Sequence, residues 1–185
     1  MRVPTAGGSP EVLLGSLPAD WGLSCPSLPA SSCVLGEKEG KDLVFYPLDP
    51  LRGKGGQLAR IEAPKSAGSA CALSPDGSSL AMVENKDRIE VLNLSERAWH
   101  EVSFEPGWGV FDGIAWAADG KGFFLSSNLA DAWGLLHVTP AGRVSLLLRN
   151  PRSQRLSTPL PSPNGKHLAF QAETYDSNVW MIENF

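Results

Sequence analysis

Apolar residues in this chain come in short runs that are separated by polar turns rich in Gly, Pro and Ser. Three segments share one order: an apolar run, a turn resembling Ser-Pro-Asp-Gly, and a second apolar run. They are residues 71–83, 114–126 and 158–170. Pro presets φ in such a turn, and Asp, Asn and Gly accept positive φ, so each segment is typical of a β-hairpin. No long window keeps helical spacing without a Gly or Pro, and we therefore predict an all-β chain.

The hairpin recurs at nearly constant intervals. Its turn begins at residues 74, 117 and 162, and a degenerate copy begins at residue 28, so that consecutive copies are 46, 43 and 45 residues apart. A period of roughly 40–50 residues is that of a four-stranded propeller blade. The pattern after each hairpin predicts a third, alternating strand and then a more charged outer strand, as expected of an edge. We therefore predict one domain, residues 1–185, that is a β-propeller of about four four-stranded antiparallel blades.

The repeat series starts and stops within a blade. We expect blades at residues 21–62, 68–104, 110–149 and 157–185, with residues 1–14 contributing extra strands. The last blade ends after its third strand, so the N-terminal strands would complete it and close a small ring, or the arc is open. Closed propellers typically have 4–8 blades. We favour a truncated, partial propeller that is part of a larger protein, and its open blade edges would allow self-association.

The repeat resembles a known group of proteins. The Ser-Pro-Asp-Gly turn, the apolar strand after it and the Gly-Gly turn before the outer strand resemble the WD-like repeats of TolB-type bacterial propellers, most clearly at 71–94 and 158–185. Residues 176–185 and 50–55 are similar to the C-terminal propellers of bacterial receptors with an N-terminal kinase or winged-helix domain. This resemblance implies a periplasmic or otherwise extracytoplasmic sensor or interaction domain. The chain has no kinase motif and no helix-turn-helix, so those activities are not inferred for it.

Composition and charge narrow the function. Hydrophobic residues make up 42% of the 185 residues, enough for a core without metal or disulfide support. The net charge is −4 and the 16 basic residues are dispersed, so no nucleic-acid surface is expected. No apolar stretch reaches the ~18–20 residues of a membrane span. The N-terminus lacks the apolar core of a signal peptide, which keeps a cytoplasmic location as the alternative.

No pattern indicates catalysis, a metal or another cofactor. The histidines have no metal-ligand spacing and fall at non-equivalent positions, which are His100, His137 and His167. One turn residue recurs per blade, and hydrogen bonding within the turn explains it better than calcium ligation does; these residues are Asp76, Asp119 and Asn164. A Gly-x-Ser-x-Gly nucleophile motif is missing. We therefore predict a non-catalytic module that binds a protein or peptide, with a propeller associated with a peptidase or lyase as the alternative.

Cysteines and aromatic residues supply two more specific expectations. Cys25 and Cys33 flank the degenerate first turn, and they form either a disulfide between neighbouring strands or two buried thiols. Aromatic residues at strand starts and loops are candidates for a binding surface, with core packing as their alternative role; they are Trp21, Trp108, Phe111 and Trp133.

Overall fold

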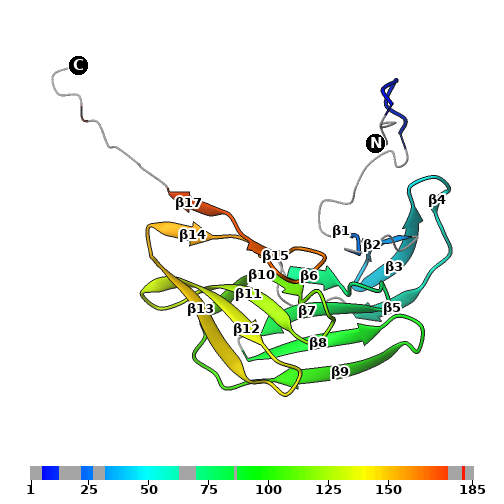
Figure 1. The fold of residues 1–185 in the computed structure, drawn as a ribbon. Helices are drawn as coiled ribbons and strands as arrows, with labels where there is room; N and C mark the ends of the chain where they lie inside the picture. Colours follow the sequence, from blue (N-terminus) through cyan, green and yellow to red (C-terminus); the bar gives the residue numbers. More distant parts are fainter. Residues whose placement is uncertain are drawn as a thin grey trace.

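The strands form successive antiparallel sheets, as a computed structural model of the chain shows (Figure 1). The structure describes residues 6–12, 22–26, 32–62, 70–85, 87–174 and 181. All regular structure within these residues is β-strand or turn, which confirms the prediction of an all-β chain. Trp21, most of the predicted N-terminal strands and the predicted third strand of the last blade lie outside the described residues.

Three blades have four strands that pair in chain order. Blade 1 contains β1 (Leu23–Ser24), β2 (Cys33–Glu39), β3 (Asp42–Asp49) and β5 (Ala59–Glu62), and the short β4 (Gly53–Lys54) pairs with the end of β3. Blade 2 contains β6 (Ala70–Leu73), β7 (Ser79–Asn85), β8 (Arg88–Asn93) and β9 (Ala98–Ser103). Blade 3 contains β10 (Val110–Trp116), β11 (Phe123–Asn128), β12 (Ala132–Val138) and β13 (Val144–Pro151). These sheets confirm the predicted four-stranded antiparallel blade.

The described part of blade 4 is a hairpin in two pieces. β14 (Gln154–Leu156) pairs with β17 (Ala172–Thr174), and β15 (Leu160–Pro161) pairs with β16 (Leu168–Ala169). The hairpin begins at Gln154, three residues before the start expected from the repeat, because β13 leads into it through a short turn. The innermost strands of blades 2 and 3, β6 and β10, lie side by side, and β15 continues this series (Figure 1).

Blade 2 contributes to two hydrophobic cores, because successive side chains of a strand point to opposite faces. On β7, Leu80 and Met82 pack with buried residues of blade 1, whereas Ala81 and Val83 pack with buried residues of blade 3. The first core includes Phe45 of blade 1, and the second includes residues of blade 3 that are almost fully buried, among them Ile114, Leu125 and Leu136.

The repeated turn is closed by its own side chains. In blade 2 the Ser74 hydroxyl donates a hydrogen bond to the Asp76 carboxylate at 2.6 Å, and the same oxygen accepts one from the Ser79 N–H at 2.9 Å. Gly77 has a φ of 77°, a conformation that favours glycine. The Asp and Gly of the motif therefore have structural roles in this turn.

In blade 1 a covalent bond joins the ends of the first two strands. Cys25 and Cys33 form a disulfide with their Cα atoms 4.2 Å apart. Leu23 pairs with Leu35 and Ser24 with Val34, so Cys25 and Cys33 are the next residues along the two strands. In blade 2, Ser74 and Ser79 likewise follow the last residues of β6 and β7 that pair with each other, Leu73 and Leu80. The disulfide thus occupies the position that the serine hydrogen bond has in blade 2.

Candidate functional site

The turns that join the first and second strands of blades 2, 3 and 4 lie beside one another at one end of these blades, which we call the turn end. Successive blades leave grooves between them there. The groove between blades 1 and 2 is about 260 Å³, the groove between blades 2 and 3 is about 320 Å³, and the groove between blades 3 and 4 is about 680 Å³. The last of these, which we call the 3–4 groove, is large enough to hold a peptide segment.

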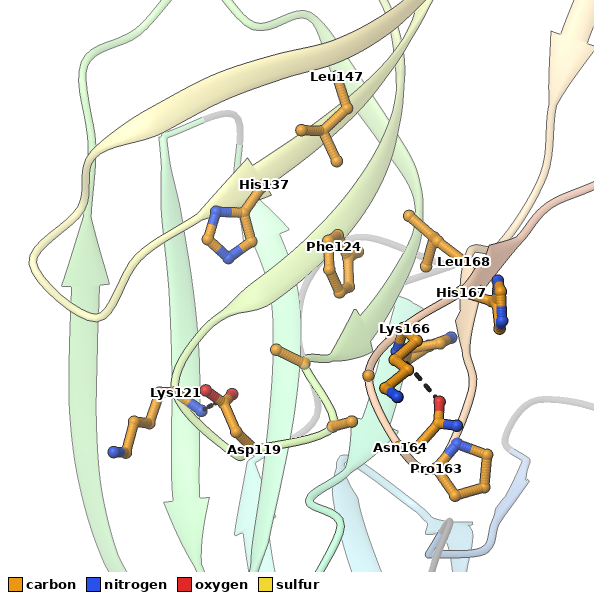
Figure 2. A pocket seen from close by; sticks show the side chains of 14 residues that line it. Asp119, Lys121, Phe124, His137, Leu147, Pro163, Asn164, Lys166, His167 and Leu168 are labelled. Carbon is orange, nitrogen blue, oxygen red and sulfur yellow. Dashed lines mark hydrogen bonds between the residues drawn. The ribbon is translucent and has the colours of Figure 1, made fainter.

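Blade 3 forms an apolar wall of the 3–4 groove. Phe124 of β11, His137 of β12 and Leu147 of β13 line it (Figure 2). Phe124 and His137 are directly paired across the two strands, and their ring centroids are 5.2 Å apart. The neighbours of Phe124 on β11, Phe123 and Leu125, point into the core with blade 2, so alternation turns Phe124 towards blade 4.

The blade 4 hairpin forms the opposite wall. Pro161 of β15 and Leu168 of β16 line the groove, and Leu168 points towards Phe124 (Figure 2). On the blade 3 wall, Leu147 is 50% exposed. The groove therefore presents apolar surface that the described residues leave open to solvent.

Polar and charged side chains from two successive turns lie at one end of this apolar surface. Asp119 accepts a hydrogen bond from the Lys121 N–H at 2.9 Å, and Asn164 accepts one from the Lys166 N–H at 3.1 Å (Figure 2). No carboxylate among the described residues forms an ion pair with the ammonium group of Lys121 or Lys166. His167 also lines the groove. The rim is thus polar, with two cationic groups available to a ligand.

The 3–4 groove differs in charge from the other two grooves. The groove between blades 2 and 3 is lined by Asp76 and Asp119 and by no basic side chain. The Ser74 hydroxyl, followed by the Ser78 N–H and hydroxyl, lowers the pKa of Asp76 and so favours its charged form. The groove between blades 1 and 2 has no charged residue in its lining. Of these three grooves, the 3–4 groove is therefore the one whose lining includes lysine side chains.

Of the aromatic residues selected from the sequence, Trp108, Phe111 and Trp133 are described, and they belong to blade 3 but do not share one surface. Trp108 and Phe111 are half-buried and pack against the core shared with blade 2, where Phe111 meets Phe104 edge to face at 5.7 Å. Trp133 is also half-buried, but it faces blade 4, with the Arg155 guanidinium 5.8 Å from its ring centre. The structure therefore does not bring Trp108 and Trp133 together.

An ion pair between blades 3 and 4 was not found from the sequence. Both carboxylate oxygens of Asp112 accept a hydrogen bond at 2.8 Å from one Arg155 amino group, and Nε of Arg155 lies 3.2 Å from Oδ2. Asp112 lies at the β-bulge between Phe111 and Gly113, where the register of β10 shifts. The repeat pattern does not indicate such a bulge, and Arg155 is 43 residues from Asp112 in the sequence. The sequence alone therefore did not suggest this pair.

Two of the three histidines considered from the sequence line the 3–4 groove, His137 from β12 and His167 from the start of the second strand of blade 4. His100 lies apart from them on β9. Within the described part of the chain, no group of three His, Cys, Asp or Glu residues is placed to hold a metal ion. Cys71 is a free thiol whose pKa is raised by burial. No helix of the described residues is long and apolar enough to cross a membrane.

Comparison with known proteins identifies the fold. No family model and no curated protein sequence matches the chain. TolB from Acinetobacter baumannii is similar in structure with a TM-score of 0.69 and 20% sequence identity, over 95% of this chain and 43% of TolB.

Further structures with TM-scores above 0.5 include an enzyme and a propeller domain. An oligogalacturonate lyase in complex with manganese has a TM-score of 0.57 and 18% identity, over 82% of this chain and 45% of the lyase. The β-propeller domain of Cps50 (Swd1) from Myceliophteria thermophila has a TM-score of 0.56 and 14% identity, over 84% of this chain and 49% of that domain. The chain therefore has a TolB-like β-propeller fold and spans less than half the length of these structures, in agreement with a partial propeller.

Proposed function

We propose that the chain is a non-catalytic binding module, the sensor or interaction part of a larger bacterial protein, and that it recognises a protein or peptide. The single observation that supports this most strongly is the 3–4 groove. It combines open apolar surface with a few polar groups at its rim, which is the usual composition of a ligand site. The resemblance to TolB, a propeller of known structure, supports the proposal at the level of the fold.

We also propose that this module works outside the cytoplasm. The disulfide between Cys25 and Cys33 supports an oxidising compartment, since such bonds are rare in cytosolic proteins. Rapid alkylation of cells, followed by mass analysis of the protein, would test this location. A bond that is intact in the cell is the expected result, and two further alkylated thiols beside Cys71 would favour the cytoplasmic alternative.

The binding function can be tested by selecting peptides from a displayed random library on the immobilised protein. Selected peptides would be measured by fluorescence anisotropy and located by changes in backbone amide signals. We expect saturable binding of peptides with a common pattern, with signal changes confined to one surface. Binding that does not saturate, or changes scattered over all blades, would contradict a binding module.

A lyase is the second candidate, because one of the similar structures is an oligogalacturonate lyase in complex with manganese. Incubation of the chain with oligogalacturonate and Mn²⁺, with absorbance of the unsaturated product as readout, tests it directly. We expect no turnover above a heat-denatured control. Turnover proportional to protein concentration would replace the non-catalytic proposal with the lyase.

A further inference from the structure

The disulfide between Cys25 and Cys33 joins the ends of two strands where other blades use a hydrogen bond. In blade 2 the Ser79 N–H donates to the Ser74 hydroxyl at 2.9 Å. Blade 4 has an equivalent bond, in which a backbone N–H donates to the Ser162 hydroxyl at 3.0 Å. Closing this end of a blade therefore does not require a covalent bond, which leaves the disulfide of blade 1 open to a second role.

The disulfide lies at the surface of the folded chain. Cys25 is exposed, and Cys33 is half-buried and lines the groove between blades 1 and 2. A thiolate breaks a disulfide by attacking one of its sulfur atoms, and disulfides that are exposed are the labile ones. An external thiol therefore meets Cys25 first.

The free thiol of Cys71 is a poor attacking group for this bond. Cys71 lies on β6, the strand of blade 2 that neighbours β1, and burial raises the pKa of its thiol. Because the thiolate is the nucleophile, burial keeps this cysteine in its unreactive form. The attacking thiol therefore comes from another molecule.

The strand that leads into Cys25 is short and contacts blade 2. β1 has two residues, whereas β6 has four and β10 has seven. Both residues of β1 pair with β2, and the Gly36 N–H donates to the Gly22 carbonyl at 3.1 Å. The Ser24 hydroxyl accepts a hydrogen bond from the Leu73 N–H at 2.9 Å, which joins the innermost strands of blades 1 and 2. So short a pairing has low local stability, and the disulfide directly after Ser24 supports it.

We propose that the bond between Cys25 and Cys33 is a site of thiol–disulfide exchange with a dithiol, and that its redox state controls the contact of β1 with blade 2. A thiolate of the dithiol attacks Sγ of Cys25 and forms a mixed disulfide, while the bond to Cys33 breaks and its electron pair leaves on Cys33 as a thiolate. The second thiolate of the dithiol attacks the dithiol sulfur of this mixed disulfide, which closes the dithiol into its own disulfide and releases Cys25. The electron pair thus passes from the dithiol to the chain, and the protons of the dithiol end on the two cysteines. This activity goes beyond the proposed binding function and does not use the 3–4 groove.

Exchange in the folded state is tested on the full chain with dithiothreitol, followed by alkylation and mass analysis. We expect a reduction rate that rises in proportion to the dithiothreitol concentration. A mixed disulfide, trapped by acid after brief exposure to glutathione, should map to Cys25. A rate that levels off at the rate of global unfolding would show that the bond is closed to thiols in the folded chain, and a mixed disulfide on Cys33 would reverse the order of attack; either result overturns the exchange as proposed.

The contact with blade 2 is followed by backbone amide signals. Reduction should move the amide proton of Leu73 upfield, because it loses its acceptor, and should leave that of Leu125 in blade 3 unchanged. Ser24→Ala removes the acceptor while the disulfide remains, so its Leu73 signal should already have moved and should move little further on reduction. The matched control is Ser145→Ala, which removes an exposed serine of β13 and should respond as the native chain does.

Two results would overturn the control of blade 2 by this bond. The first is an unchanged Leu73 signal after thiol titration has shown that both cysteines are reduced. The second is a collapse of signal dispersion in every blade on reduction, which would show that the bond only holds the fold together. Selection of peptides tests the proposed binding function separately, so failure of either proposal leaves the other standing.

Discussion

Removal of the disulfide in blade 1 should have a measurable and calculable effect on stability. The bond joins residues that are 8 apart in sequence, and closing so short a loop lowers the conformational entropy of the unfolded chain by an amount that corresponds to about 2.5 kcal/mol at 25 °C. For a chain of this size, about 1 kcal/mol shifts the melting temperature by roughly 2–4 °C. We therefore expect the double variant Cys25→Ser/Cys33→Ser to melt roughly 5–10 °C below the native chain.

Thermal unfolding followed by circular dichroism, with and without a reductant, is the assay. The reductant should lower the melting temperature of the native chain to that of the double variant and should leave the variant unchanged. A Cys71→Ala chain retains the disulfide and serves as the control for effects on the free thiol. The reasoning is refuted if the native chain keeps its melting temperature after thiol titration has shown that both cysteines are reduced.

Three further predictions concern the turn, the core and a tight contact. Asp76→Asn should destabilise the chain at neutral pH: the hydrogen bond from the Ser74 hydroxyl, the largest cause, lowers the pKa of Asp76 below its ordinary value of 3.8. This carboxylate therefore adds stability above pH ~4, and that stability is lost as the pH falls through the folded-state pKa. In urea unfolding, the difference in unfolding free energy between the native chain and the variant should be smaller at about pH 3 than at about pH 7. Leu125→Ala removes a fully buried side chain and should cost about 2–5 kcal/mol in urea unfolding, and a loss below about 1 kcal/mol would contradict the described core. Gly142→Ala should lower the melting temperature, because Gly142 has a φ of 75° and a Cβ there would clash with the Ser103 carbonyl oxygen of blade 2; an unchanged melting temperature would show that this contact is not tight.

The sequence predicted what depends on local chemistry. The blade period follows from turns whose residues determine a backbone conformation locally, and the turns that begin at residues 74, 117 and 162 lie where the repeat predicts them. The degenerate copy at residue 28 lies outside the described residues. Alternation also accounts for the opposite facing of Leu80 and Ala81 on β7. For the cysteines, the sequence left a disulfide and two thiols equally open, because the choice depends on the register of β1 and β2.

The candidate site could not be predicted because it depends on contacts between blades. Trp108 and Trp133 look equivalent as aromatic residues near strand starts, yet they lie on opposite faces of blade 3. Phe124 is one of two consecutive phenylalanines, and only packing against blade 2 shows which of them is left for the 3–4 groove. The pair of Asp112 and Arg155 requires both a bulge and the placement of the next blade, neither of which has a local signal.

The participation of blade 2 in two cores has a consequence for how the protein loses its structure. In an array whose units contact only their neighbours, stability is close to a sum of unit and interface contributions, so a unit with an interface on each side opens less readily than a terminal one. Blade 2 has such interfaces with blades 1 and 3. Opening should therefore proceed from the ends inward, and the amide protons of Ala81 and Ile89 should exchange with solvent among the slowest in the chain. A ligand that bound across the 3–4 groove would extend this slow-exchanging region towards the C-terminal end of the arc.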